Sequence, residues 1–440
     1  MTIFTPEIFA PENLPFNLEL LPKPAYLVGG AVRNAILGRN RDYIDLDFIL
    51  PSEAVNIARK IAKYHQAGFV LLDEQRQIAR VVFPHATVDI AQQEGDSLEA
   101  DLCRRDYTIN AIAYNIHTQE IIDPLQGGKD LEKGILRMIS AANLQDDPLR
   151  LMRGYRQAAQ LGFTIEPETH STIRSLAEHL NKVAAERIRV ELGYMLGHPQ
   201  GTSWLIKAIQ DGLLKSSFQD ATSQSCSLLI EVDRAASQLT EHLPALKGIL
   251  QQNIKDTVKI TWLGIAKLAC LVNPKPEVAL SQLEKLTYSK AEIQAVTCAL
   301  RLFPKLNASP MSLREQYFLF READCVFPTT AILAVAYGNV VEEMSEDKPL
   351  QTYASLLARY LNPDDPVAHP TQLVSGIHII SSLNLPSSPL IGKLLTEIAV
   401  AQVEGKICTS DEAIEFARKL VQLDTTGVVE TGRIATSINN

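Results

Sequence analysis

Cysteines are few in this chain, and they are not paired. Six are scattered along 440 residues without any Cys-x-x-Cys spacing: Cys103, Cys226, Cys270, Cys298, Cys325 and Cys408. This scatter argues against a zinc knuckle and against a disulfide framework. We therefore expect reduced and mostly buried thiols.

Basic charge is not in excess either, since the net charge is −9 at pH 7. Proteins that coat nucleic acid indiscriminately neutralise phosphates with a broad basic surface, so this balance argues against that class. It does not exclude RNA, because a local stripe of arginines between Arg150 and Arg156 can hold one RNA end while the rest of the surface stays acidic.

Long apolar runs are missing as well. None approaches the roughly 20 residues that span a bilayer, and the first residues lack a basic segment followed by an apolar core. We expect a cytoplasmic protein without a membrane partner. A chain of 440 residues with 46% hydrophobic content can bury several cores, and two to four domains are expected.

Two glycines lie between a predicted strand at residues 25–28 and a predicted helix at residues 31–37. Gly29 and Gly30 let backbone N–H groups approach a phosphate, and a helix N-terminus favours negative charge. Arg33, about one turn into the helix, can reach the same phosphates with its forked guanidinium. Taken alone, such a pair is more often only a tight strand-to-helix turn.

Two aspartates alternate with apolar residues on the next predicted strand, residues 43–50. Asp45 and Asp47 should therefore share one face. Divalent cations between these carboxylates and substrate phosphates would relieve their repulsion, and oxygen ligands suit Mg²⁺. We predict that both are catalytic metal ligands in a two-metal displacement. The alternative for an isolated strand of this kind is a solvated polar face.

Four charged residues recur every three positions at the start of a predicted helix over 148–161: Asp147, Arg150, Arg153 and Arg156. They should form one polar stripe that faces the preceding α+β region. An aspartate and an arginine fixed side by side can offer acceptor and donor groups to a base edge. An exposed charged helix face is the commoner role of such a stripe.

Three segments in this order resemble the class II tRNA nucleotidyltransferase and bacterial poly(A) polymerase family. They are Leu27-Val-Gly-Gly-Ala-Val-Arg-Asn34 with Ile44-Asp-Leu-Asp47, then Arg104-Arg-Asp-Tyr-Thr-Ile-Asn-Ala111, then Asp146-Asp-Pro-Leu-Arg150. The resemblance implies an α+β fold with a polymerase-β-like nucleotidyltransferase head over 1–140 that contains a mixed sheet. An all-helical neck over 141–200 and a helical body and tail over 201–440, which would bind tRNA, would follow.

The resemblance also implies roles for single residues. Arg105 would contact the nucleotide, and Asp106 and Asn110 would organise the sugar pocket. Asp147 and Arg150 would read the incoming base in place of a nucleic-acid template. The complete nucleotide-binding set would be Gly29, Gly30, Arg33, Arg105, Asp106, Asn110, Asp147, Arg150, Arg153 and Arg156, of which the last two would hold phosphates or the RNA end.

The chain departs from the family pattern in two places. The first motif usually ends in aspartate, and here it ends in Asn34, which can still accept a hydrogen bond. Only residues 90–103 separate Asp89 from Arg104, whereas relatives that build the whole CCA end carry a longer flexible loop there. The short segment resembles the branch that adds two cytidines and leaves the final adenosine to a separate enzyme.

The expected reaction is therefore transfer of CMP from CTP to the tRNA 3′ end with Mg²⁺. Two alternatives share the same site and remain open. A full CCA-adding enzyme would use ATP as well as CTP, and a poly(A) polymerase would use ATP. A non-catalytic RNA-binding protein that keeps the fold is the alternative from another class, and Asn34 makes it conceivable.

Overall fold

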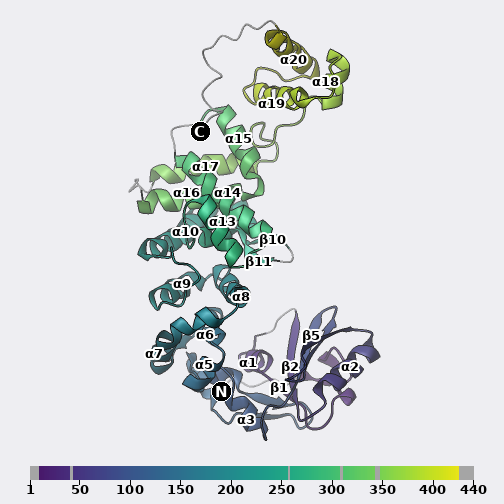
Figure 1. The fold of residues 1–440 in the computed structure, drawn as a ribbon, viewed down its shortest axis with the longest axis vertical. Coiled ribbons are helices and arrows are strands. Elements are labelled where there is room, and N and C mark those ends of the chain that lie inside the picture. The colour runs from purple at the N-terminus through teal and green to yellow at the C-terminus, as the bar shows by residue number, and fades with distance from the viewer. Residues whose placement is uncertain (1–8, 40–42, 256–257, 308–310, 342–346, 426–440) are drawn as a thin grey trace. The chain divides into compact units, whose positions relative to one another are not determined.

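The computed structural model describes residues 9–39, 43–255, 258–307, 311–341 and 347–425. The chain forms two compact units, Met1–Gln219 and Asp220–Asn440 (Figure 1). The first unit contains a mixed sheet followed by helices, and the second is mostly helical. The expected fold class is confirmed. The domain boundaries predicted at residues 140 and 200 stay predictions.

A seven-stranded sheet forms the head, in the order β3-β4-β5-β2-β1-β6-β7. Only β2 and β5 run parallel within it, so the sheet is mixed as predicted. The strands are β1 (Tyr26–Val28), β2 (Ile44–Leu50), β3 (Gly68–Asp73), β4 (Ile78–Phe83), β5 (Ala86–Gln92), β6 (Ala113–Asn115) and β7 (Glu120–Ile122).

The two faces of β2 have different surroundings because side chains alternate along a strand. Leu46, Phe48 and Leu50 are buried on one face, where helix α2 (Ala54–His65) packs on β3, β4 and β5 (Figure 1). Asp45 and Asp47 lie on the opposite face. The alternation read from the sequence thus places both aspartates on one face of the strand, which they share with the buried Ile49.

Short helical elements precede the first strand, connect strands of the sheet or follow its last strand. They are η2 (Pro11–Asn13), η3 (Leu18–Leu20), α1 (Gly30–Ile36), α3 (Leu98–Cys103), η4 (Thr108–Asn110) and α4 (Gly127–Lys133). Asp123 accepts hydrogen bonds from the backbone N–H groups of Gly127 (2.7 Å) and Gly128 (2.9 Å). A Cβ at Gly127 would collide with the carbonyl oxygen of Thr108, so this glycine lets α4 support η4.

The helices after the head are α5 (Ala141–Asp146), α6 (Leu149–Leu161), α7 (Pro167–Leu176), η5 (Ala177–Lys182), α8 (Ala185–Leu196) and α9 (Gly201–Gln210). Gly162, at φ +71°, ends α6 where the sequence predicts. The neck is not entirely helical, because β8 (Ile135–Leu136) pairs in parallel with β9 (Thr164–Ile165). This pair crosses the boundary expected near residue 140.

The second unit contains one small hairpin and a series of helices. These are α10 (Ser223–His242), α11 (Pro244–Gln251), β10 (Asn253–Lys255), β11 (Val258–Thr261), α12 (Trp262–Ala269), α13 (Pro276–Lys285), α14 (Lys290–Asn307), α15 (Leu313–Ala323), η6 (Asp324–Val326), α16 (Phe327–Val341), α17 (Asp347–Leu361), α18 (Gly376–Leu383), α19 (Pro389–Val403) and α20 (Ser410–Thr425). The hairpin is the second exception to an all-helical remainder.

Two sequence expectations need correction. The helical stretch Leu313–Val341 is long and apolar enough to cross a membrane, although the sequence analysis expected no such segment. Of its most apolar window, 67% is buried, as in the core helix of a soluble domain.

All six cysteines are free, but Cys270 alone is fully buried, so the thiols are not mostly buried. The exposed ones include Cys103 and Cys408.

Candidate active site

A glycine turn brings the first strand against the acidic strand. Gly29 follows β1 with φ +72°, a conformation that favours glycine. A Cβ at this position would lie 3.3 Å from Asp47 Oδ2 and 3.6 Å from Arg105 Nη1. The turn, one predicted metal ligand and one predicted nucleotide ligand therefore meet at a single point.

Asp45 and Asp47 lie beside two polar residues of the parallel strand β5. The register places Asp45 opposite Thr87 and Asp47 opposite Asp89. Thr87 Oγ1 donates a 2.6 Å hydrogen bond to Asp45 Oδ1. Asp89 is held by Arg80, whose Nε and Nη2 donate to its two oxygens at 2.6 and 2.7 Å. Three carboxylates consequently gather on one face of the sheet.

This crowding changes the acidity of Asp47. Burial raises its pKa, and the neighbouring charges of Asp89 and Asp45 raise it further, to about 6, although Arg105 acts in the opposite direction. A negative charge at Asp47 is thus poorly compensated by the protein alone. The donor set fits a divalent cation, since oxygen ligands and excess negative charge are what such an ion requires.

The guanidinium of Arg33 is fixed in a largely buried position. Its Nε and Nη2 donate to Asn34 Oδ1 at 3.2 and 3.1 Å, and Nη1 donates to Asn110 Oδ1 at 2.7 Å. Asn34, the residue that departs from the family pattern, thus still accepts from Arg33. The exchange of aspartate for asparagine keeps the bonds and removes a negative charge beside the arginine.

A second buried network joins the head to α6. Asp106 accepts from Arg153 Nε (2.9 Å), from Asn110 Nδ2 (2.9 Å) and from the backbone N–H of Tyr107 (2.8 Å). Burial alone would raise the pKa of Asp106, but Arg153 and these hydrogen bonds lower it to about 2. Asn110 Nδ2 also donates to Gln157 Oε1 at 2.9 Å. The predicted sugar pocket is therefore anchored to the helix.

The remaining stripe residues diverge. Arg150 Nη1 donates to the backbone carbonyls of Arg104 (2.8 Å) and Asn143 (2.9 Å). Asp147 precedes α6 and pairs with Arg187 of α8 at 3.0 Å. Arg156 turns away from the head: it pairs with Glu191 of α8 and donates to Gln160. The expectation of one stripe facing the head is thus wrong for Arg156, because it points to the neighbouring helix.

A cavity of about 350 Å³ opens between α1 and β2. It is lined by Gly30, Arg33, Asn34, Asp45 and Asp47, together with apolar residues of the N-terminal segment and of β2. Predicted phosphate ligands and predicted metal ligands therefore share one cavity. Its volume suits a small ligand or part of a nucleotide.

Comparison with known proteins agrees with this geometry. Residues 25–137 match the family described as "Poly A polymerase head domain", residues 162–224 match "Probable RNA and SrmB- binding site of polymerase A", and residues 257–417 match tRNA nucleotidyltransferase domain 2. A CC-adding tRNA nucleotidyltransferase from Synechocystis sp. is 44% identical over 93% of this chain and 96% of the relative. The chain belongs to the tRNA nucleotidyltransferase family.

Other nucleotidyltransferases are more distant. A CC-adding tRNA nucleotidyltransferase from Geobacter sulfurreducens is 29% identical over 90% of this chain and 91% of the relative. A solved CCA-adding enzyme in complex with CTP has the same fold, with a TM-score of 0.67 and 22% identity over 92% of this chain and 91% of that one. The family resemblance read from three motifs is confirmed.

Sequence reasoning missed several residues of this nucleotidyltransferase site. Asp89 and Thr87 alternate on β5 as Asp45 and Asp47 do on β2, so the same period-2 signal could have found them. Arg187 lies in a segment that reads as mainly structural, and no local pattern links it to Asp147. Gln157 is buried and polar on a helix, which only the contact with Asn110 explains.

The described residues contain no group of three or more His, Cys, Asp or Glu side chains placed to hold a metal by themselves. A cation bound by Asp45 and Asp47 would therefore take further oxygens from other ligands such as phosphate, which is how Mg²⁺ is usually held with nucleotides. Arg105 supports a ligand here as well: its Nε is buried and has no hydrogen-bond partner among the described residues.

Proposed function

We propose that this nucleotidyltransferase adds CMP from CTP to the 3′ end of tRNA and stops after two cytidines. The 44% identical relative, a CC-adding enzyme, supports the reaction and the product. In the reaction, the tRNA 3′ oxygen forms a bond to the α-phosphorus of CTP, and the bond from that phosphorus to the β-phosphate oxygen breaks. Pyrophosphate leaves, and the 3′ hydroxyl proton passes to solvent.

The residues in and around the nucleotide cavity would have different roles in this reaction. Gly29 and Gly30 leave room for the triphosphate, and the fixed guanidinium of Arg33 and the half-buried Arg105 hold its charge. Asp45 and Asp47 would hold Mg²⁺, which would lower the charge repulsion between the attacking oxygen and the phosphate. Asp147 and Arg150 would select cytosine at the start of α6.

The segment between β5 and α3 carries the choice of product. Gln92 ends the strand, and Leu98 already begins the helix. Between them, the backbone N–H of Glu94 donates to Asp101 Oδ2 at 2.9 Å, and the carboxylate of Glu94 pairs with Arg104 at 3.0 Å. The whole segment is thus a braced turn without a long loop, which supports addition of CC rather than CCA.

The deciding experiment incubates the purified protein with a tRNA transcript that lacks its CCA end, with CTP, ATP and Mg²⁺, and sequences the product ends. We expect two cytidines and no further growth. Adenosine on a CC end would establish a full CCA-adding enzyme, and long adenosine tracts would establish a poly(A) polymerase. After CC addition, a separate A-adding enzyme in the cytoplasm would complete the end.

The metal-ligand assignment has its own test. Asp45→Ala and Asp47→Ala should each lower CMP incorporation by a factor of roughly 10³, because transition-state charge stabilisation by such groups is worth several kcal/mol. Asp411→Asn, at the exposed start of α20, is the control and should keep full activity. Wild-type protein without incorporation would instead leave a non-catalytic RNA-binding protein.

A further inference from the structure

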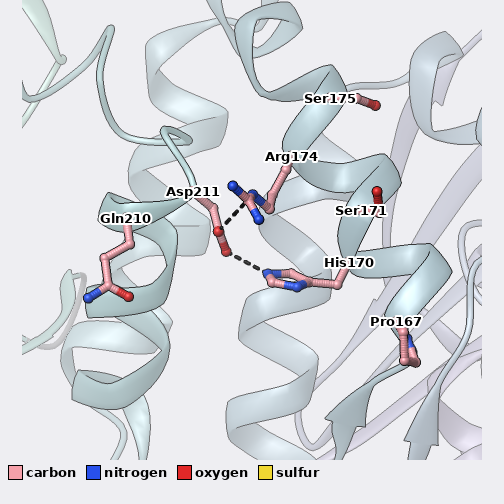
Figure 2. A pocket seen from close by; sticks show the side chains of 7 residues that line it. All are labelled: Pro167, His170, Ser171, Arg174, Ser175, Gln210 and Asp211. Carbon is pink, nitrogen blue, oxygen red and sulfur yellow. Dashed lines mark hydrogen bonds and ion pairs between the residues drawn. The ribbon is translucent and has the colours of Figure 1, made fainter.

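A second cavity of about 550 Å³ lies between α7 and the end of α9 (Figure 2). Its lining residues are Pro167, His170, Ser171, Arg174, Ser175, Gln210 and Asp211. None of them belongs to the nucleotide cavity. No residue of this polar cavity has a role in the proposed transfer reaction, so the cavity calls for a separate functional explanation.

The carboxylate of Asp211 forms the inner wall, and its side chain is only 8% exposed. Its Oδ2 accepts from Tyr155 Oη at 2.6 Å and from His170 Nε2 at 2.7 Å. Its Oδ1 lies 3.3 Å from Arg174 Nε. Three groups therefore share this negative charge, and little of the carboxylate faces the open side.

The side chain of Arg174 lies at the open side of the cavity instead. Its side chain is 62% exposed, and Figure 2 shows it reaching from α7 across to Asp211. Contact with Asp211 occupies Nε, and among the described residues no hydrogen bond or ion pair uses the terminal nitrogens of Arg174. The hydroxyl of Ser171 and the side-chain amide of Gln210 add polar groups along the same cavity.

This arrangement suits an oxyanion. The guanidinium is oriented by a shielded carboxylate, and its free edge offers two parallel N–H donors that match two oxygens of a phosphate. Because Arg174 is paired with Asp211, the two formal charges nearly cancel, and a phosphodiester with a single negative charge is accommodated more readily than a free phosphate dianion.

We propose that this cavity binds a backbone phosphodiester of the tRNA substrate. The inference rests on the proposed function and deepens it by naming a contact for the RNA. All seven lining residues fall inside the segment that matches the RNA-binding family region, residues 162–224. Phosphate contacts fix the register of a nucleic acid without reading its sequence.

The site is connected to α6 by Tyr155. This side chain is fully buried, donates to Asp211 from α6 and packs edge-on against Trp204 with ring centroids 5.8 Å apart. Arg153, two residues earlier, contacts Asp106 in the head. A phosphate held by Arg174 would thus be connected through Asp211 and Tyr155 to the helix that contacts Asp106 of the head.

Binding of a tRNA transcript that lacks CCA tests the proposal. We expect Arg174→Gln to raise the Kd for tRNA about tenfold. It should also reduce the slope of log Kd against log salt concentration by about one, which corresponds to one lost phosphate contact. Arg174→Lys should retain part of the affinity. Arg59→Gln, an exposed arginine of α2, is the matched control and should bind like wild type.

A second variant keeps the test decisive if Arg174→Gln fails to fold. Ser171→Asp adds a negative charge to the cavity without touching the contacts of Asp211, and it should weaken tRNA binding at least as much as Arg174→Gln. Ser171→Ala should bind nearly as tightly as wild type. Circular dichroism spectra that match wild type would confirm that each variant is folded.

The outcomes separate this proposal from the proposed function. CMP incorporation with wild-type tRNA affinity in both Arg174→Gln and Ser171→Asp would overturn the cavity proposal alone. Inorganic phosphate that binds in an Arg174-dependent way, with unchanged tRNA affinity, would overturn it in favour of a free phosphate site. A wild-type protein that neither binds tRNA nor incorporates CMP would overturn both.

Discussion

Asn34 is the residue whose identity matters most against the family pattern. Its single side-chain oxygen accepts from two nitrogens of Arg33, which a buried guanidinium needs. Asn34→Leu should raise the KM for CTP about tenfold, because an unpaired buried donor costs about 1–3 kcal/mol and the arginine would turn away. Steady-state kinetics of CMP incorporation measure this.

Asn34→Asp is the matched control. It keeps both hydrogen bonds and restores the family residue, so activity should stay within about threefold of wild type, since the geometry of Arg33 is retained. A strong loss in Asn34→Asp, combined with a normal Asn34→Leu, would mean that Arg33 does not hold the triphosphate.

Asp106 makes the stability of the first unit depend on pH. Its pKa is lowered to about 2 in the folded protein, against 3.8 as the ordinary value. The ionised form is therefore the stabilised one: the contribution, about 2 kcal/mol, is complete above about pH 5 and is lost as the pH falls through 2. Asp106→Asn should accordingly destabilise at pH 7 and only about half as much at pH 3.

Urea unfolding followed by tryptophan fluorescence can measure this. The chain has two tryptophans, so a Trp262→Phe background leaves Trp204 as the reporter of the first unit. Asp364→Asn, at an exposed position of the second unit, is the control and should show no such change. An equal loss at both pH values would contradict the role assigned to the carboxylate charge.

At the scale of elements, the sequence predicted which segments form strands and helices around the site. Gly29, Asp45 and Asp47 were found because turn chemistry and period-2 alternation are local signals. Pairing between distant elements is not local. The register that brings Asp89 beside Asp47, and the contact of Asp147 with Arg187, depend on how β5 and α8 pack, which no spacing in the chain encodes.

Helix α6 can pack closely against the head because residue 154 is a glycine. Tyr107 is fully buried, and its hydroxyl donates to the carbonyl of Arg150 at 2.7 Å. A Cβ at Gly154 would collide with that hydroxyl and lie 3.1 Å from Tyr107 Cζ. Gly154→Ala should therefore lose about 1–3 kcal/mol of stability through overpacking and should weaken the preference for CTP over UTP, because α6 is displaced.

Gly193→Ala is the control for this prediction. Gly193 lies in α8, and a Cβ there would meet nothing within 4 Å. Alanine should stabilise this helix by roughly 0.5–1 kcal/mol, since it removes backbone freedom from the unfolded chain. Thermal unfolding of both variants measures the contrast, and equal effects would refute the packing argument.

At the scale of the whole molecule, the chemistry is confined to one of two compact units. Every candidate site residue, from Gly29 to Arg156, lies in Met1–Gln219, as does the phosphate cavity between α7 and α9. The unit Asp220–Asn440 has cores of its own, one of which packs Ile379, Leu394 and Ile398 around α18, α19 and α20. We therefore expect nucleotide chemistry to depend on the first unit alone and tRNA binding to draw on both units.

This division predicts the behaviour of a fragment that contains residues 1–219. The side chain of Asp220 accepts hydrogen bonds from Asn273 and Gln282, which both belong to the second unit. A chain that ends at Gln219 therefore cuts none of these contacts out of the first unit. The fragment should bind CTP with Mg²⁺ within about threefold of the full chain, because the nucleotide cavity is complete in it. Its tRNA affinity should fall at least about tenfold, since the helices after residue 219 would supply much of the RNA contact. Calorimetric titration with CTP and filter binding of tRNA separate the two effects. A fragment that keeps full tRNA affinity would assign RNA binding to the first unit alone, and one that loses CTP while folded would place part of the nucleotide site elsewhere.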